Sequence, residues 1–190
     1  DEQMIPLAER IYKVRLEFIE KLLPIFRELY STISGYKEDI SISYESHLTA
    51  GNFQETLAAA KEKDKIIQYS SVGVHKDDLV FLINDVPVRR YASQGQQKSF
   101  LIALKLAQFK FMAQVKGEAP ILLLDDIFDK LDESRVTRLM ELVTQNNFGQ
   151  LIITDSHNDR LKSVFNDLGI ELPVYQVQNS QVERNGSIIV

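Results

Sequence analysis

Apolar residues recur with helical spacing over the first part of the chain. Met4, Ile11, Phe18 and Ile25 repeat every seven residues. The stripe is widened by further apolar side chains, namely Ile5, Ala8, Tyr12, Ile19, Leu22, Phe26, Leu29 and Ile33. A stripe this wide is typical of a helix packed in a bundle rather than of a two-stranded coiled coil. It predicts a helical arm over residues 4–33.

Two prolines lie within this expected helix. Pro6 is acceptable in a first helical turn, where its missing N–H has no intrahelical partner to lose. Pro24 is expected to kink or interrupt the helix, because it removes a backbone hydrogen bond and its ring clashes with the preceding turn.

The middle of the chain changes between strand and helix patterns. Alternating apolar and polar residues predict a strand over about 38–46. Helical spacing returns from Asn52 to Ile67, where alternating charges are typical of a solvated face. Two further β segments, 79–83 and 86–91, are expected to form a hairpin joined at Asn84-Asp85.

Helix and strand patterns then alternate to the end of the chain. Their order is helix 96–115, strand 120–125, helix 133–145, strand 149–154 and helix 158–168. Two short β segments, 174–178 and 187–190, close the chain around an expected turn at Asn185-Gly186. Alternation of this kind is typical of a parallel sheet flanked by helices. We therefore predict an α/β fold with an α-helical arm domain, divided into residues 1–70 and 71–190.

Composition narrows the class of protein. The chain has 190 residues, 44% hydrophobic and 26% charged, which is ordinary for a globular protein of one domain and an appendage. The net charge of −5 argues against a surface that is basic all over. DNA binding would then need a local patch, or a part of the protein outside this chain.

The sequence gives no sign of a membrane or secretory protein. No apolar run approaches the ~20 residues of a membrane span, and the first residues lack the features of a signal peptide. Cysteine is absent, which excludes disulfides and thiolate metal sites. We expect a cytoplasmic protein with no membrane partner.

The predicted strand before residue 126 ends in two carboxylates. The run from Ile121 to Leu124 is apolar throughout, as expected for a central parallel strand buried on both faces. Ligands of open α/β sheets bind beyond the carboxyl ends of strands, where Asp125 and Asp126 lie. Adjacent acids repel unless a cation or proton is shared. Asp125 is a candidate Mg²⁺ ligand, and Asp126 a candidate water-orienting base.

A second candidate site opens the helix expected at 96–115. In Ser93-Gln94-Gly95-Gln96, a hydroxyl and backbone N–H groups at a helix N-terminus predict an anion site. Gly95 would leave room for a phosphate, and Lys98 could add positive charge one turn later.

The order of the two motifs is more specific than either motif alone. The Ser-x-Gly-Gln start lies about 30 residues before the Asp-Asp pair, and Leu131-Asp132 follows that pair. Few other nucleotide sites have this order. A glycine-rich loop ending in Gly-Lys-Ser/Thr is missing, since none of the eight glycines is followed by lysine. We expect the chain to be the C-terminal part of a larger ATPase.

These motifs resemble those of the ABC-type ATPase heads of DNA-repair and chromosome proteins, and among these the RecF family of bacterial recombination mediators. The segment 73–79 resembles a Gly-Pro-His-Arg-Asp-Asp segment of that family. The segments 92–98 and 124–135 also carry the resemblance, which extends over essentially the whole chain. It implies that residues 71–190 are the C-terminal lobe of an ABC-type head. Residues 1–70 would be an arm-like domain inserted ahead of that lobe.

The resemblance also implies roles for the matched residues. Ser93, Gly95 and Gln96 would form the signature motif and contact the γ-phosphate of an ATP held by the other subunit of a dimer. Asp125 would be the Walker B ligand of Mg²⁺, and Asp126 would hold the catalytic-base position. Asp132 would be the D-loop acid that crosses the dimer interface. We assign the cofactors ATP and Mg²⁺ on this basis.

The sequence departs from the family pattern at three places. Asp126 stands where most ABC ATPases have Glu, and the shorter side chain favours slow hydrolysis. Val74 replaces the usual Pro. The position of the switch histidine is occupied by Asp155, with His157 two residues later. Thr154 or Asp155 is then a candidate for the γ-phosphate environment, and His157 is the alternative switch residue.

The implied function is ATP-dependent DNA binding in recombinational repair, with a weak DNA-dependent ATPase activity. The family binds duplex DNA near single-strand gaps, forms ATP-dependent homodimers, and cooperates with RecR and indirectly with RecO and RecA. Candidate DNA contacts in this chain are Arg89, Arg90, Lys105 and Lys110.

Three alternatives stay open at this point. A transporter cassette or a chromosome-organising head would share the site, although the arm and Asp155 argue against a transporter. A receiver-like domain also uses an acid pair, but would have it on its first strand and would need a later phosphoacceptor Asp. Finally, this chain alone is expected to be catalytically silent, because it lacks the phosphate-cradling loop.

Overall fold

The computed structural model describes residues 3–49, 51–145, 148–156, 163–166, 168–169 and 172–188. The chain divides into two compact units. Unit 1 comprises Asp1–Glu28 and Glu38–Ala92, and unit 2 comprises Leu29–Lys37 and Ser93–Val190. The functional division expected after residue 70 stays a prediction.

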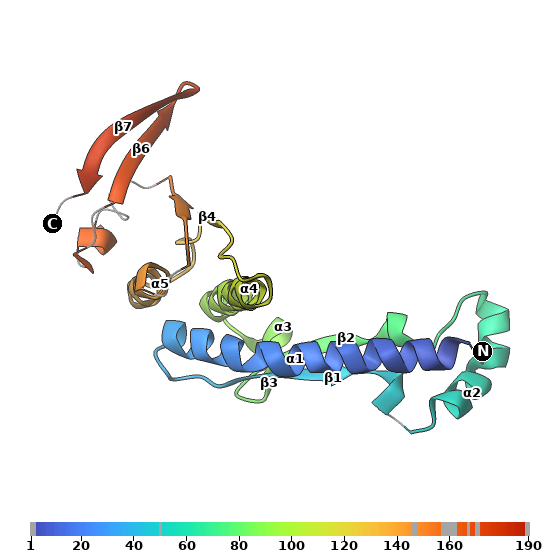
Figure 1. Cartoon of the computed structure of the whole chain (residues 1–190). Coiled ribbons are helices and arrows are strands. Elements are labelled where there is room, and N and C mark those ends of the chain that lie inside the picture. Colours follow the sequence, from blue (N-terminus) through green and yellow to red (C-terminus); the bar gives the residue numbers. More distant parts are fainter. Residues whose placement is uncertain are drawn as a thin grey trace. The chain divides into compact units, whose positions relative to one another are not determined.

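Unit 1 combines one long helix with a small antiparallel sheet (Figure 1). Its elements are most of α1 (Met4–Ser34), β1 (Ile40–Glu45), η1 (His47–Thr49), α2 (Phe53–Ile67), η2 (Val74–Lys76), β2 (Asp78–Ile83), β3 (Val86–Pro87) and α3 (Val88–Tyr91). The strand order is β1-β2-β3, with β1 and β2 paired from Ile40↔Ile83 to Glu45↔Asp78. The predicted helices and the first strand of this unit are confirmed.

The expected hairpin is confirmed only in part. Asn84 and Asp85 form its turn, with φ of 48° and 63°, as a two-residue turn requires. The second strand ends at Pro87 instead of continuing to residue 91, and α3 follows at once. Proline has no N–H to donate to a strand partner and its φ is preset for a helix start, so pairing stops there.

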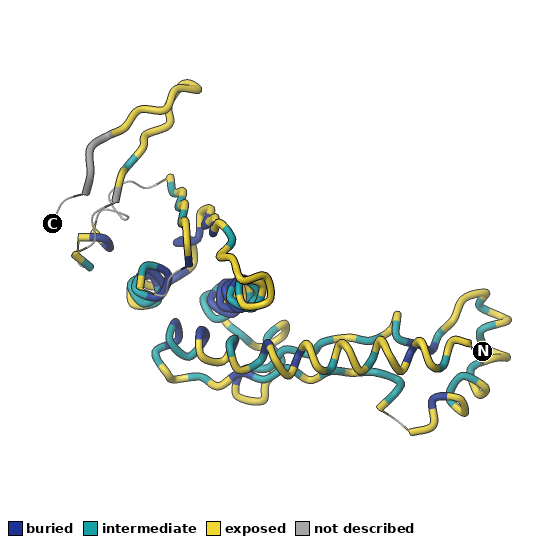
Figure 2. The backbone as a smooth tube through the Cα atoms, in the orientation of Figure 1, coloured by how far each residue is buried: buried dark blue, intermediate teal, exposed yellow. Residues whose placement is uncertain are grey.

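The long helix α1 packs on a helix near its start, where Ala8 and Phe53 of α2 share one apolar cluster, and on the sheet further along. In unit 1 its middle lies against the sheet: the Tyr12 ring stacks on Tyr44 of β1 at a centroid distance of 5.4 Å. The outer side of α1 is exposed at the apolar residues Met4, Leu7, Ile11, Val14 and Phe18. Figure 2 shows this long exposed edge of α1 (yellow) beside its buried positions.

The expected interruption at Pro24 is wrong, because α1 continues through it to Ser34. Leu22 and Phe26 flank the proline and are 3% and 0% exposed. Burial of these large side chains offsets the ~3 kcal/mol that a proline costs within a helix.

A buried carboxylate joins α1 to the sheet of unit 1. Asp77 is 3% exposed in its side chain, and its Oδ2 accepts from Arg15 at 2.7 Å and from the Tyr44 hydroxyl at 2.5 Å. Arg15 also donates to the Val74 carbonyl at 2.6 Å. Burial and the hydrogen bond to Asp77 raise the pKa of Tyr44. The 73–79 segment therefore has a structural role in unit 1.

Unit 2 contains a parallel strand pair and the helices that cover one side of it. Its elements are the end of α1, then α4 (Gln94–Lys116), β4 (Leu122–Asp125), α5 (Glu133–Gln145), β5 (Leu151–Thr154), β6 (Leu172–Gln178) and β7 (Gln181–Ile188). The strands β4 and β5 are parallel, as predicted, in the register Leu122↔Leu151 to Asp125↔Thr154.

The core of unit 2 lies among α4, α5 and the end of α1. Its largest fully buried side chains include Tyr30, Phe128, Leu29, Ile33, Leu106, Leu139, Met140 and Val136. The Tyr30 ring meets Phe100 of α4 edge to face at 5.7 Å. This core fixes the starts of α4 and α5, which carry the candidate site.

Burial of β4 differs from the prediction of a strand covered on both faces. Leu122 and Leu124 are buried, but Ile121 and Leu123 are 59% and 66% exposed. In the described part of unit 2, β4 pairs only with β5, and only one face of the pair is covered.

The C-terminal hairpin also differs in register. Strands β6 and β7 pair antiparallel around Asn179 and Ser180, with φ of 49° and 62°. Asn185 and Gly186, expected to form the turn, lie within β7 instead. Two consecutive left-handed residues suit a tight hairpin turn, which Asn179 tolerates as well as Asn185 would.

Two remaining expectations concern the segment after β5. The helix expected over 158–168 falls largely outside the described residues, although 163–166 and 168 are helical. His157 lies outside the described residues. In the described part of the chain, no helix is long and apolar enough to span a bilayer.

Candidate functional site

Ser93 caps the N-terminus of α4 in a capping box. Its Oγ accepts from the Gln96 N–H at 3.2 Å, and the Gln96 Oε1 accepts from the Ser93 N–H at 2.8 Å. Ser93 itself is exposed. A solvent-facing helix start that combines a hydroxyl with first-turn N–H groups is suited to bind an anion.

Gly95 lies where α4 approaches the loop after β4. A Cβ at this position would come 3.3 Å from the Lys130 carbonyl oxygen. Its backbone conformation is helical, so the need for glycine comes from this close approach and not from φ. The space that we assigned to a phosphate is thus limited on one side by the backbone of Lys130.

Asp125 and Thr154 lie side by side at the carboxyl ends of β4 and β5. They are register partners, and the Thr154 hydroxyl donates to Asp125 Oδ1. The Asp126 N–H donates to the Thr154 carbonyl at 3.2 Å. The two acids therefore emerge at the edge of the sheet where ligands of α/β proteins bind, as the sequence predicted.

The backbone of Asp126 is left-handed, with φ of 46°. Asp and Asn adopt this conformation more readily than Glu, because their short side chains bond locally. This gives a structural reason for Asp where most ABC ATPases have Glu. The Lys98 ammonium donates to the Asp126 carbonyl at 3.3 Å, so α4 contacts the loop directly.

Asp132 caps α5 in the way that Ser93 caps α4. Its Oδ1 accepts from the Arg135 N–H at 3.0 Å and from the Ser134 hydroxyl at 2.6 Å. The hydrogen bond from Ser134 is the main reason that the pKa of Asp132 lies below its usual value; the Arg135 N–H and charge act in the same direction. Asp132 is therefore ionised at neutral pH, with 58% of its side chain exposed.

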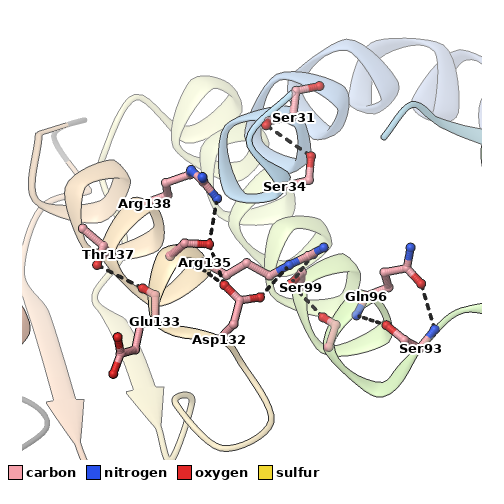
Figure 3. A network of polar contacts seen from close by, with 12 residues as sticks. Ser31, Ser34, Ser93, Gln96, Ser99, Asp132, Glu133, Arg135, Thr137 and Arg138 are labelled. Carbon is pink, nitrogen blue, oxygen red and sulfur yellow. Dashed lines mark hydrogen bonds and ion pairs between the residues drawn. The ribbon is translucent and has the colours of Figure 1, made fainter. Parts of the chain in front are cut away.

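Two residues that sequence reasoning missed join these helix starts (Figure 3). The Arg135 Nε lies 3.2 Å from Asp132 Oδ2, and its Nη1 donates to the Ser99 Oγ at 3.0 Å. The Ser99 hydroxyl donates in turn to the Gly95 carbonyl at 2.8 Å. One signal was available: Ser99 is a polar residue on the apolar face of its helix, and it is fully buried.

The predicted Mg²⁺ site at Asp125 needs oxygen ligands from the protein. No group of three or more His, Cys, Asp or Glu side chains suited to a metal ion occurs among the described residues. The Asp125 carboxylate and the Thr154 hydroxyl place two oxygen atoms side by side, joined by a hydrogen bond. Mg²⁺ commonly takes one or two protein oxygens and completes its shell with phosphates and water, so the pair fits such an ion.

The remaining candidates lie after β5, on α3 and on α4. Asp155 follows β5 and is half-buried. Among the candidate DNA contacts, Arg89 and Arg90 are exposed on α3 of unit 1. Lys110 lies over the Phe148 ring in unit 2, at 5.7 Å.

The comparisons with known proteins agree on one family. No family model matches the chain. The "DNA replication and repair protein RecF" of Bacteroides thetaiotaomicron is 42% identical over 187 residues, which is 98% of this chain and 51% of the relative. The RecF of Flavobacterium johnsoniae is 46% identical over 86% of this chain and 46% of its own length. The chain thus spans about half the length of these curated relatives.

Solved structures give the same result. The recombination mediator protein RecF with ATP matches at a TM-score of 0.68 and 27% identity, over 95% of this chain and 48% of that one. An SMC ATPase matches at a TM-score of 0.58 and 14% identity, over 90% of this chain and 86% of that one, which shows the fold alone. The fold is that of an ABC-type ATPase head lobe with a parallel strand pair and flanking helices.

Proposed function

This chain is homologous to RecF along about half the length of that protein, and we propose that it is the C-terminal part of an ATP-dependent DNA-binding ATPase of recombinational repair. The observation that carries the proposal is the arrangement in unit 2. There the capped start of α4, the acids after β4 and the cap of α5 are tied together by hydrogen bonds and an ion pair.

ATP in this proposal binds between two copies of the protein. Ser93, Gly95 and Gln96 of one copy face the γ-phosphate of a nucleotide held by the other. The Ser93 Oγ already accepts from the Gln96 N–H, which leaves its own hydrogen to donate to a phosphate oxygen. The α4 dipole favours the same anion. Nucleotide would therefore stabilise the dimer, and its loss would release it.

The acids after β4 act on the bound nucleotide. Asp125 and the Thr154 hydroxyl would hold Mg²⁺, which when bound would neutralise charge on the phosphates. Asp126 would orient the attacking water, and its short side chain would place that water less well than Glu does. A weak, DNA-stimulated ATPase activity of the intact protein is the expected result.

The chain alone is expected to be inactive. It lacks the Gly-Lys-Ser/Thr loop that cradles phosphates, so it would neither hold ATP well nor hydrolyse it. Residues 1–70 would act as the arm, and residues 71–190 as the signature lobe.

Homodimers would bind duplex DNA near single-strand gaps in the cytoplasm, cooperate with RecR, and through RecR and RecO help to load RecA. The relatives' name as DNA replication and repair proteins supports this role.

Duplex binding by the intact protein tests this role. We expect Mg²⁺-ATP to increase affinity for a gapped duplex, and log affinity to fall linearly with log salt. Replacing Arg89 and Arg90 with Ala should weaken binding and reduce the salt slope by about 1–2, since each phosphate that is no longer neutralised lowers the slope by roughly 0.9. Replacing Lys61 and Lys63 on the solvated face of α2 is the control. Absence of ATP-dependent, salt-sensitive binding would overturn the proposal.

A further inference from the structure

Arg135 connects the two helix starts of the candidate site. Its guanidinium contacts the Asp132 carboxylate through Nε at 3.2 Å and the Ser99 hydroxyl through Nη1 at 3.0 Å. The Ser99 hydroxyl continues the chain to the Gly95 carbonyl at 2.8 Å. Asp132, Arg135, Ser99 and Gly95 thus form one unbroken polar path, which we name the α4–α5 bridge.

The middle of the α4–α5 bridge is shielded from water, whereas its ends are not. Ser99 is 0% exposed and the Arg135 side chain 14%, but the Asp132 side chain is 58% exposed. Ser93, two residues before Gly95, is also exposed. The α4–α5 bridge therefore runs from the exposed Asp132 through the protein interior to the helix turn that carries the exposed Ser93.

We propose that Arg135 and Ser99 are positioning residues, which set the place of the Ser93–Gln96 turn according to the place of Asp132. This inference rests on the proposed composite ATP site. In this inference neither Arg135 nor Ser99 contacts the nucleotide. They couple Asp132, the acid that crosses the dimer interface, to the Ser93–Gln96 turn, which meets the γ-phosphate.

Two further contacts hold the same segments together. Gly95 packs closely on the backbone of Lys130, since a Cβ added to this glycine would lie only 3.3 Å from the Lys130 carbonyl oxygen. Lys98 donates to the Asp126 carbonyl at 3.3 Å. The start of α4 is thus joined at three points to the segment between Asp126 and Arg135. A shift of Asp132 on meeting a second copy would therefore move the start of α4 as well.

The chemistry of the α4–α5 bridge requires a guanidinium. Arginine offers several donors in a rigid planar fork, so it can contact Asp132 and Ser99 at once. Lysine has a single nitrogen on a flexible stem and could keep the ion pair without reaching Ser99. A buried polar path of this kind is not needed for stability, since well-packed apolar residues can replace it, but the loss of one member leaves its partners unpaired. Its effect is to fix relative position, which makes the two roles separable by experiment.

The test uses the intact protein and compares Ser99→Ala, Arg135→Lys and the double variant. Thr137→Ala is the matched control for Ser99, because the Thr137 hydroxyl bonds the Glu133 carbonyl four residues earlier in the same helix, at 3.0 Å. Arg138→Lys is the control for Arg135, because Arg138 Nη1 donates to Ser134 within its own helix, at 3.3 Å. Alanine is favourable in a helix and adds no polar group, so the Ser99 variant should fold.

Two quantities are measured for each protein: the affinity of the monomer for ATP and the dimer dissociation constant in Mg²⁺-ATP. We expect Ser99→Ala and Arg135→Lys each to weaken dimerisation roughly tenfold, the value of one hydrogen bond to a charged group. Monomer affinity for ATP should match that of the controls, whatever fall in the unfolding midpoint the unpaired guanidinium causes. The double variant should be no weaker than Arg135→Lys, because both changes interrupt one path.

The outcomes separate this inference from the proposed function. If the parent dimerises with ATP but both variants behave as their controls, or their effects add independently, the bridge has no positioning role and the proposed function stands. If the parent shows no ATP dependence at all, the composite site fails, and the positioning role fails with it.

Discussion

Asp77 offers a sharp test of how unit 1 is held together. Its buried Oδ2 accepts from Arg15 and from the Tyr44 hydroxyl, whereas no partner for its buried Oδ1 occurs among the described residues. Asp77→Asn keeps the shape of the side chain and removes the charge. The perturbation is therefore electrostatic, with little change in packing.

The magnitude follows from the two hydrogen bonds. A hydrogen bond to a charged group is worth about 1.5–3 kcal/mol and a neutral one about 0.5–1.5, so each bond should lose about 1 kcal/mol. Arg15 is 45% exposed and can be rehydrated, which reduces its share. We expect Asp77→Asn to cost about 1–2 kcal/mol. Asp77→Ala should cost about 2–4 kcal/mol, because the acceptor of both hydrogen bonds is lost.

Amide hydrogen exchange in β1 and β2 measures this loss locally, without assuming that both units unfold together. Asp78→Asn is the matched control, because Asp78 is exposed and caps the Leu79 N–H, at 2.8 Å. It should change the opening free energy by less than about 0.5 kcal/mol. Equal protection of the β1–β2 amides in the Asp77 and Asp78 variants would refute the assigned role of Asp77.

Three further predictions concern unit 2. Ser134→Ala should raise the pKa of Asp132 towards its usual value, because the bond from Ser134 is the main cause of the depression. Since the folded pKa is lowered, the stability contributed by ionised Asp132 is present above the unfolded pKa and is lost as pH falls through the folded one. A carboxyl-carbon NMR titration checks this, and an unchanged pKa would contradict it. Asp126→Asn should keep the left-handed backbone and the ATP-dependent dimer, while the rate of ATP hydrolysis by the intact protein falls by a factor of about 10² or more. Hydrolysis at the parent rate would exclude Asp126 as the base. Ser93→Ala should cost about 1 kcal/mol of local stability at the start of α4, seen as faster amide exchange in its first turn, and unaltered exchange there would show that the capping box contributes nothing.

Local sequence signals placed the elements of the candidate site well. The helix start at Ser93 and the strand end at Asp125 follow from caps and apolar runs, which act between residues close in sequence. The parallel pairing of β4 and β5 followed from the alternation of helices and strands. These features therefore could be predicted without a structure.

Burial was harder to predict than element type. The apolar run around Leu123 predicted two covered faces, yet Leu123 is 66% exposed. An apolar run predicts that its side chains are buried, but it does not predict which segment buries them. This chain spans about half the length of its RecF relatives, so such a segment need not be part of it. Part of the apolar face of α1 is exposed for a similar reason, because helical spacing predicts an apolar face without predicting what covers it.

The bridge through Arg135 and Ser99 could not be predicted from the sequence. These residues are 36 positions apart, and their contact depends on the packing of α4 against α5. In the same way, two turn-forming dipeptides occur near the end of the chain. Only the paired strands show that Asn179 and not Asn185 begins the turn.

The solution mass of the intact protein with and without Mg²⁺-ATP tests the composite ATP site most directly, when it is measured beside a Ser93→Arg variant. The larger, charged arginine side chain should block the γ-phosphate position at the start of α4. It should not disturb the core, because Ser93 is exposed. We predict a dimer that forms only with ATP and is lost in the variant. A mass that is the same with and without ATP, or a variant that dimerises as the parent does, would contradict the account.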